Sequence, residues 1–283
     1  MKEKKNIISI ENLLCLLIII CPILDVASFL FRDHFGTSIS ISTILRPIIP
    51  ITAIVYIFFK DKIKIKLIVA GVIYVLYGIL HLYIFETIVT TCAYGNVIRE
   101  LQYIINYTFM IMNLFIYLYI FIFRKNTEDK GNGIKKLRMA MLISFTIYIV
   151  LMYVAILTGT SSHTYMEDLM GYKGWFESGN SVGSIMILML FGVLPMLNKS
   201  YNKKIRILTL VDVILSGIYL STLLGTRVGL FGFALVIFIY VICEIIYNAY
   251  NNKKINKKIV SLGVRNILRV IDSGDFIWVY NYF

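Results

Sequence analysis

Long apolar segments, separated by short charged loops, follow one another along almost the whole chain. Each is about long enough to cross a hydrocarbon layer of roughly 30 Å at 1.5 Å per residue. Eight such segments are expected, at Leu13–Phe31, Ile41–Phe59, Leu67–Phe85, Leu101–Phe123, Met139–Leu157, Asn180–Leu197, Ile207–Leu224 and Val228–Tyr247. The pattern predicts an all-α fold, a polytopic helical membrane protein, because helices satisfy their own backbone hydrogen bonds in lipid.

The loops between these segments differ in charge. If the N-terminus is cytoplasmic and each segment crosses, the cytoplasmic stretches hold 23 of the 28 Lys and Arg residues. The external stretches hold only Arg32, Arg99, Lys173 and Arg227. This bias follows the positive-inside rule and predicts eight spans with the N-terminus in the cytoplasm of a bacterial plasma membrane.

Composition agrees with a membrane protein: 59% of the residues are hydrophobic and 16% are charged. The net charge of +12 is explained by topology, so no nucleic-acid partner is expected. Three dispersed histidines and four cysteines without metal-ligand spacing predict neither a metal nor a cofactor. No nucleotide-binding loop lies on the predicted cytoplasmic side, which disfavours an ATP-driven pump.

Two parts of the chain are distinguished. Residues 1–247 are expected to form the transmembrane bundle. Residues 248–283 begin with a basic stretch and continue with a sequence too charged for a span and too short for a domain. This tail is interpreted as a basic cytoplasmic segment or as the truncated start of a further one.

Arg227 lies between two predicted spans, with only Gly225 and Thr226 beside it as turn residues. A guanidinium at the end of a membrane hairpin is costly unless an anion or water meets it. The alternative is an interfacial anchor at the tip. Gly225, Gly229 and Gly232 predict close packing around the turn.

Arg46 and Asp25 lie in the outer parts of the second and first predicted spans. Arg46 precedes Pro47 and suits an anionic group such as a pyrophosphate, which a planar guanidinium binds well. Its alternatives are snorkelling outward or a structural ion pair with Asp25. Asp25 could instead be an acid/base group.

The polar loop 158–179 holds further candidates. His163 is a possible general base near neutral pH, and Glu177 is a second acid/base candidate. Trp175 and Phe176 suit either a membrane interface or stacking on a sugar ring. The alternative is a solvated loop without a catalytic role.

The stretch GWFESGNSVG predicts a tightly packed helix start. Its three glycines, Gly174, Gly179 and Gly183, indicate close backbone approach. Asn180 is expected to cap this helix, and the helix N-terminus could also receive an anion.

The unusual polar residues are all expected in the outer half of the protein or in external loops: Asp25, Arg32, His34, Arg46, Arg99, Glu100, His163, Glu177, Asn180 and Arg227. This one-sided distribution favours chemistry at the outer leaflet over transport through the membrane.

Three short motifs, in order and spacing, carry a family resemblance: Gly179-Asn180, Leu194-Pro195 and Thr226-Arg227. With the opening CPILDVASFLFRDHFGTSISISTILRP they resemble the O-antigen ligase and O-antigen polymerase superfamily, over most of residues 10–245. The opening is similar to Gram-positive members that make capsule or teichuronic-type polymers.

The resemblance implies a glycosyltransferase of the outer leaflet. It would transfer a glycan from undecaprenyl pyrophosphate to an acceptor sugar hydroxyl, with membrane lipids and other polysaccharide-assembly proteins as further partners. Arg46 and Arg227 would bind the pyrophosphate, with Asn180 beside them, and a base would activate the hydroxyl.

The chain also departs from the family, whose members have more spans and a large, late external loop with further catalytic residues. Either His163 takes that role, or the chain is a truncated and inactive member. The competing hypotheses are a transporter or flippase for an anionic lipid or solute, and a non-catalytic membrane partner.

Overall fold

The computed structural model describes residues 10–35, 41–60, 64–84, 112–123, 127–165, 170–198 and 200–251. Two compact units are distinguished, residues 1–44 with 121–283 and residues 45–120. The second unit contains most of α2 (Ile41–Lys60), α3 (Lys64–Ile84), the helical residues 112–118 and the start of the π-helix η3 (Tyr119–Phe123).

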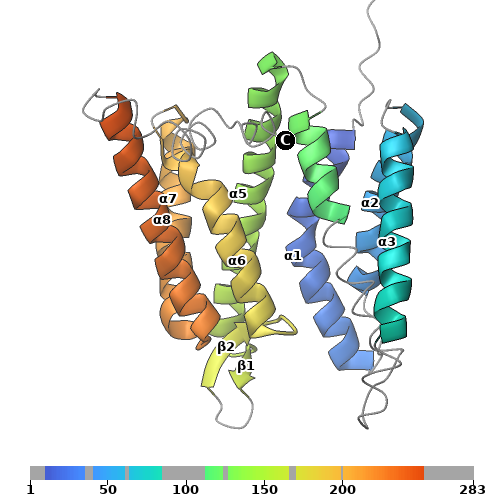
Figure 1. Ribbon diagram of the computed structural model, residues 1–283. Helices are drawn as coiled ribbons and strands as arrows, with labels where there is room; N and C mark the ends of the chain where they lie inside the picture. The colour runs from blue at the N-terminus through green and yellow to red at the C-terminus, as the bar shows by residue number, and fades with distance from the viewer. Residues whose placement is uncertain are drawn as a thin grey trace, which may run out of the picture. The chain divides into compact units, whose positions relative to one another are not determined.

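The first unit is a helical bundle with one β-hairpin. Its elements are α1 (Ile10–Phe35), α5 (Thr127–Leu157), β1 (Ser162–Tyr165), β2 (Met170–Gly174), α6 (Gly179–Val193), the 3₁₀ helix η4 (Leu194–Leu197), α7 (Lys203–Ile218), the π-helix η5 (Tyr219–Leu223) and α8 (Arg227–Asn251). Helix α5 packs against α1, α6 and α7, and α6 packs against α8. The hairpin lies at the end of the bundle where α6 and α8 begin (Figure 1).

Five helical stretches of the described residues are long and apolar enough to cross a membrane: Ile10–Phe31, Gly131–Leu157, Gly179–Leu197, Lys203–Leu223 and Arg227–Ile246. They coincide with five of the eight predicted segments, so the helical, polytopic fold is confirmed. Helices α2 and α3 also lie where the pattern places them. The count of eight and the cytoplasmic N-terminus stay predictions.

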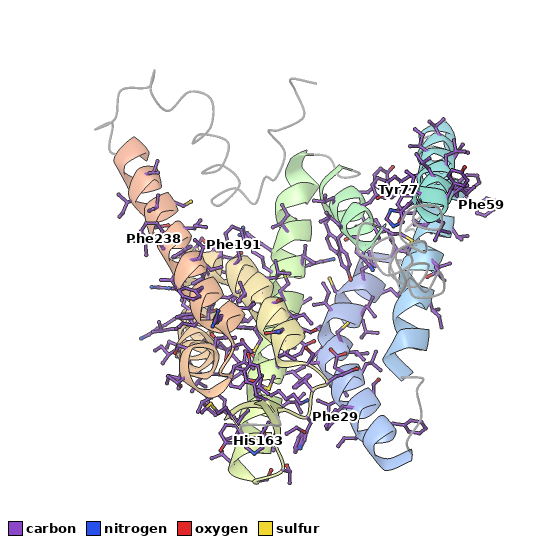
Figure 2. All side chains as sticks on the ribbon, turned by 60° about the horizontal axis from the view of Figure 1, so that its bottom comes forward. Phe29, Phe59, Tyr77, His163, Phe191 and Phe238 are labelled. Carbon is purple, nitrogen blue, oxygen red and sulfur yellow. The ribbon has the colours of Figure 1, made fainter. Side chains whose placement is uncertain are left out.

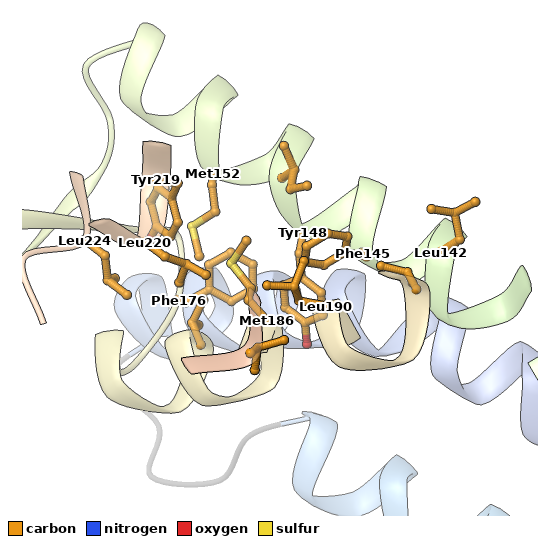
Figure 3. Close-up of a cluster of buried hydrophobic side chains, with 14 of the residues drawn as sticks. Leu142, Phe145, Tyr148, Met152, Phe176, Met186, Leu190, Tyr219, Leu220 and Leu224 are labelled. Carbon is orange, nitrogen blue, oxygen red and sulfur yellow. The ribbon is translucent and has the colours of Figure 1, made fainter. Parts of the chain in front are cut away.

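The bundle is held together by an apolar core centred on α5 and α6. Tyr148 and Phe176, the latter from the segment before α6, pack with their ring centroids 5.4 Å apart. Figure 3 shows these rings with the side chains around them, including Phe145, Met152, Met186, Leu190, Tyr219, Leu220 and Leu224. Lipid is as apolar as these groups, so close packing rather than transfer from water stabilises such a core.

Many large apolar side chains of both units are exposed on their helices. Phe59 is 72% exposed and Phe238 is 63% exposed, and Figure 2 shows them, with Tyr77 and Phe191, on the outside of their helices. Such surfaces suit contact with lipid acyl chains, which agrees with the membrane assignment.

Two connections contain regular structure that the pattern does not indicate. Helix α5 begins at Thr127, within the charged stretch between the fourth and fifth predicted segments. The predicted polar loop 158–179 contains the antiparallel hairpin β1–β2. The division between a bundle ending at residue 247 and a tail stays a prediction, since residues 252–283 lie outside the described part.

Candidate active site

The turn between η5 and α8 is built from three residues. Gly225 has a φ of +73°, a left-handed conformation that glycine adopts without strain. Thr226 is buried, and its Oγ1 accepts a hydrogen bond from the backbone N–H of Gly229 at 3.1 Å. Thr226 thereby caps α8, and Arg227 becomes the first residue of that helix.

Arg227 is exposed. In the described part of the chain, no hydrogen bond or ion pair joins its guanidinium to another residue. The cap and the turn therefore fix the backbone of the Thr-Arg motif and leave the charged group open to a ligand or to solvent.

The hairpin is fastened to this turn at two hydrogen bonds. The Thr164 hydroxyl donates to the backbone oxygen of Leu224 at 2.8 Å. The Tyr219 hydroxyl, at the start of η5, donates to the backbone oxygen of Tyr172 at 2.8 Å. Each bond joins one strand to the polypeptide that leads into the turn.

Two glycines allow the backbones to approach between these bonds. Gly171 has a φ of +68°, and a Cβ there would collide with the backbone oxygen of Leu224. A Cβ on Gly225 would lie 3.1 Å from the Cα of Gly171. A side chain at either position would separate the hairpin from the turn.

The start of α6 completes the same group of elements. A Cβ on Gly179 would lie 2.8 Å from Cγ2 of Thr164, and one on Gly183 would lie 3.0 Å from Cδ2 of Leu224. A Cβ on Gly229 of α8 would lie 2.7 Å from the backbone oxygen of Leu220. The predicted close approach at both glycine-rich motifs is confirmed. We call β1, β2, the start of α6 and residues 224–227 the hairpin end.

Asn180 does not cap α6, and that prediction is wrong. The cap is Ser178, with φ −135° and ψ 124°, and its hydroxyl accepts from the N–H of Ser181 at 3.4 Å. Asn180 is the second residue of the helix itself, and its side chain is exposed. Its amide is thus available at the helix start rather than used in capping.

His163 lies on β1, opposite Tyr172 of β2. Its Nδ1 is 3.3 Å from the backbone oxygen of Gly171, and its ring centroid is 5.1 Å from that of Tyr172. The neighbouring Thr164 points at the Leu224 turn, so the alternation of a strand directs His163 to the opposite face of the hairpin. Figure 2 shows His163 at this end of the bundle.

Glu177 is exposed and directly precedes the cap of α6. Its backbone oxygen accepts from Nζ of Lys173 at 3.0 Å, which ties β2 to this connection. Glu177 therefore lies closer in sequence and structure to the α6 start than His163 does.

Asp25 is placed on the other side of α5. Its Oδ2 accepts a hydrogen bond of 2.8 Å from the hydroxyl of Tyr148, whose ring packs on Phe176. A chain of contacts thus links Asp25 to the connection before α6. The bond is to α5, whereas Arg227 belongs to the α6–α8 side, so the structure does not bring these two residues into direct contact.

Arg46 belongs to α2, in the unit formed by residues 45–120, and its side chain lies outside the described residues. Its proposed partnership with Arg227 or Asp25 stays a prediction. Arg99 and Glu100 lie outside the described residues, so their expected position in an external loop also stays a prediction.

The sequence interpretation missed Asp212. This carboxylate lies near the middle of the Lys203–Leu223 span, is 2% exposed, and accepts a hydrogen bond of 2.6 Å from Thr146 of α5. The expectation that the unusual polar residues all lie toward one side is therefore wrong. The sequence signal for this buried carboxylate was a single acidic residue inside an apolar segment.

The hairpin end combines groups that suit an anion. The N-termini of α6 and α8 both open there, and the first turn of a helix presents unpaired N–H groups and a partial positive charge. The exposed Arg227 adds a full positive charge at the start of α8. The arrangement can hold a phosphate-type group beside exposed carboxylate and amide side chains.

One comparison with known proteins gives a result. A family model described as O-antigen ligase like membrane protein matches residues 8–275, which is most of the chain. No curated protein and no solved structure matches it.

Proposed function

We propose, because this chain belongs to the O-antigen ligase-like membrane protein family, that it transfers a glycan from undecaprenyl pyrophosphate to an acceptor sugar hydroxyl. The family supports a membrane enzyme of surface polysaccharide assembly. The proposal adds the reaction, the lipid carrier and a site at the outer leaflet of a bacterial plasma membrane.

In the proposed reaction the acceptor oxygen attacks the anomeric carbon of the donor. The bond from that carbon to the pyrophosphate oxygen breaks, undecaprenyl pyrophosphate leaves, and the acceptor proton passes to a base. Arg227 and the helix N-termini would stabilise the charge that develops on the leaving group. Arg46 is the second arginine of this proposal, and Asn180 would hydrogen-bond the same group.

The base is proposed among His163, Glu177 and Asp25. Glu177 is supported by its exposure beside the α6 cap. His163 is supported by a ring that can exchange a proton near neutral pH, and Asp25 is connected to the site through its hydrogen bond with Tyr148.

A single observation carries the proposal: the hairpin, the Gly-Asn helix start and the Thr-Arg turn, which are separate in sequence, meet at one end of the bundle and leave Arg227 exposed. An interfacial anchor would not need the buried Thr226 cap, the left-handed glycines Gly171 and Gly225, or a hairpin hydrogen-bonded to the turn.

The transporter alternative keeps one specific observation in its favour. Asp212 is buried near the middle of its span, where carboxylates often mark ion or proton pathways. Its hydrogen bond to Thr146 also fits a purely structural pair between α5 and α7.

Replacing Arg227 separates these functions. In a strain that depends on this protein, Arg227→Ala should lower surface polymer by roughly 100-fold or more, and Arg227→Lys should retain part of it, since lysine keeps the charge and loses the planar guanidinium. Lys204→Ala, which removes an exposed cation at the opposite end of α7, is the matched control and should leave polymer unchanged.

The stalled intermediate should accumulate as lipid-linked glycan on the outer leaflet, accessible to periodate added to intact cells. Accumulation on the inner leaflet would instead support the transporter. Normal polymer in Arg227→Ala cells, with the protein present in the membrane, would contradict the proposal.

A further inference from the structure

The two faces of the hairpin have different neighbours. Thr164 and Gly171 belong to the face that lies on the Leu224–Gly225 turn. The directly opposed pairs are His163 with Tyr172 and Tyr165 with Met170. Opposed residues of an antiparallel pair share a face, so these four side chains form the other one, which we call the aromatic face.

The aromatic face is accessible. Tyr165 is 46% exposed, Met170 is 64% exposed and Tyr172 is 39% exposed. The His163 and Tyr172 rings lie together, with centroids 5.1 Å apart and planes inclined by 38°. Two tyrosine rings, an imidazole and a thioether thus form a surface that is apolar in its ring planes and polar at its hydroxyl and nitrogen atoms.

The hairpin cannot easily swing away from the bundle. Its inner face is bonded to Leu224 through Thr164, and the backbone of Tyr172 is bonded to the buried Tyr219. At the end of β2 the N–H of Gly174 donates to Oγ of Ser161 at 3.0 Å, and just beyond it the Trp175 Nε1 donates to Oγ1 of Thr160 at 2.9 Å. The strands that carry the rings are therefore held against the bundle.

The aromatic residues that the sequence suggested for sugar stacking are not the exposed ones. Phe176 is 2% exposed and packs on Tyr148 in the core, and Trp175 is half-buried. Tyr165 and Tyr172 take their place at the surface.

We propose that the aromatic face is a glycan-binding platform that receives sugar rings of the lipid-linked glycan. The inference rests on the proposed function. A pyranose has an apolar C–H face and equatorial hydroxyls, so it packs flat on an aromatic ring while neighbouring polar atoms take its hydrogen bonds. A glycan whose pyrophosphate is bound near Arg227 has to leave the membrane at the end of the bundle that this hairpin covers.

A membrane anchor is the other occupant that exposed tyrosines suit. The glycan is favoured because the same hairpin is fastened, through its inner face, to the turn that presents Arg227. An anchor would need neither this fastening nor a histidine ring beside Tyr172 in the aromatic face.

Binding can be measured without transfer. The full chain, purified in detergent, is titrated with soluble oligosaccharide repeat units released by mild acid from the surface polysaccharide of the producing strain, and saturation-transfer NMR reports the Kd. Tyr172→Ala and Tyr165→Ala should each weaken binding about five- to tenfold, while Tyr172→Phe should stay within about twofold because the ring remains.

Phe238→Ala removes a still more exposed ring from α8 and should leave the Kd unchanged. If one tyrosine variant fails to fold, the other keeps the test complete. Wild-type affinity in both alanine variants, the result expected of a membrane anchor, would overturn the platform. Equal losses in Tyr172→Phe and Tyr172→Ala would overturn stacking as its basis.

The two proposals fail separately. A normal polymer level in Arg227→Ala cells would contradict the proposed transfer reaction. It would not affect the oligosaccharide titration, because that measurement needs no reaction. Unchanged oligosaccharide binding in the tyrosine variants would contradict the glycan-binding platform. It would not affect the polymer measurement on Arg227→Ala.

Discussion

The hairpin end and the interior of the α5–α6 bundle are held together in different ways. The interior is filled with large side chains, such as Phe145, Tyr148 and Met186, none of which is more than 1% exposed. At the hairpin end, glycines remove side chains so that backbones can meet, and two hydroxyl hydrogen bonds fix the contact. The stability of the interior thus depends on the volume of its side chains. The contact between hairpin and turn depends on backbone conformation.

This difference has a functional meaning. Close-packed side chains make a stable bundle, but they are closed to a ligand. Backbone contacts at the hairpin end hold a hairpin, two helix starts and a turn in register while the side chains of Arg227, Asn180 and Glu177 remain exposed. Damage to the two regions should therefore appear in different measurements.

The largest effect on stability is expected from Phe145→Ala. Truncating a fully buried aromatic ring leaves a cavity and should cost about 3–5 kcal/mol, seen as a lower unfolding temperature of the purified protein in detergent. The matched Phe238→Ala, on an exposed face of α8, should change it little. Equal loss in both variants would contradict the division between core and lipid-facing surface.

A smaller effect on stability, but a specific effect on the hairpin, is expected from Gly171→Ala. The positive φ alone costs about 1–2 kcal/mol, and the new methyl group meets the Leu224 backbone oxygen. Protease cleavage of the hairpin should increase and surface polymer should fall, while the bundle still unfolds near the wild-type temperature.

Gly159→Ala is the control for this change. Gly159 has a similar φ of +69°, but a Cβ there would meet no atom within 4 Å. Gly159→Ala therefore has the same cost of a positive φ as Gly171→Ala, but its methyl group collides with no neighbour. If both variants lose polymer equally, backbone strain rather than contact with the turn explains the loss.

The smallest effect is expected from Thr164→Val, which keeps the shape of the side chain and removes its hydrogen bond to Leu224. The loss should be about 1 kcal/mol of hairpin stability, measured as faster amide hydrogen exchange in β1 and β2. Thr164→Ser should restore slow exchange.

Thr222→Val serves as the matched control for Thr164→Val, because the Thr222 hydroxyl donates to the backbone oxygen of Ile218, one turn earlier in the same span, and not to the hairpin. Faster amide exchange of the hairpin in Thr222→Val, or wild-type exchange in Thr164→Val, would show that the contact between the hairpin and the Leu224 turn does not depend on the Thr164 hydrogen bond.

The sequence predicts the membrane helices because their signal is repeated along many residues. Apolar length and loop charge add up over each segment, so Leu13–Phe31 and Val228–Tyr247 appear close to their observed positions as α1 and α8. The glycines near Thr226 were also informative, since close packing leaves few alternatives to glycine. The family resemblance, drawn from short motifs, is confirmed by the match over residues 8–275.

Features that depend on partners distant in the sequence were not predictable. The hairpin is stabilised by Leu224 and Tyr219, more than 40 residues from its strands, so its own polar sequence indicated only a loop. Ser178 and Asn180 are both good caps, so residue type alone did not select Ser178, which is the observed cap. Asp212 was missed because its partner, Thr146, lies on another helix.

The most direct test of the central claim is transfer by the purified full chain in lipid nanodiscs. Undecaprenyl-pyrophosphate-linked repeat units from the producing strain are added, and released undecaprenyl pyrophosphate is measured by mass spectrometry. We expect release coupled to longer glycan with the wild-type chain, reduced roughly 100-fold or more by Arg227→Ala and unchanged by Lys204→Ala. Equal release by wild-type protein and Arg227→Ala would contradict the central claim.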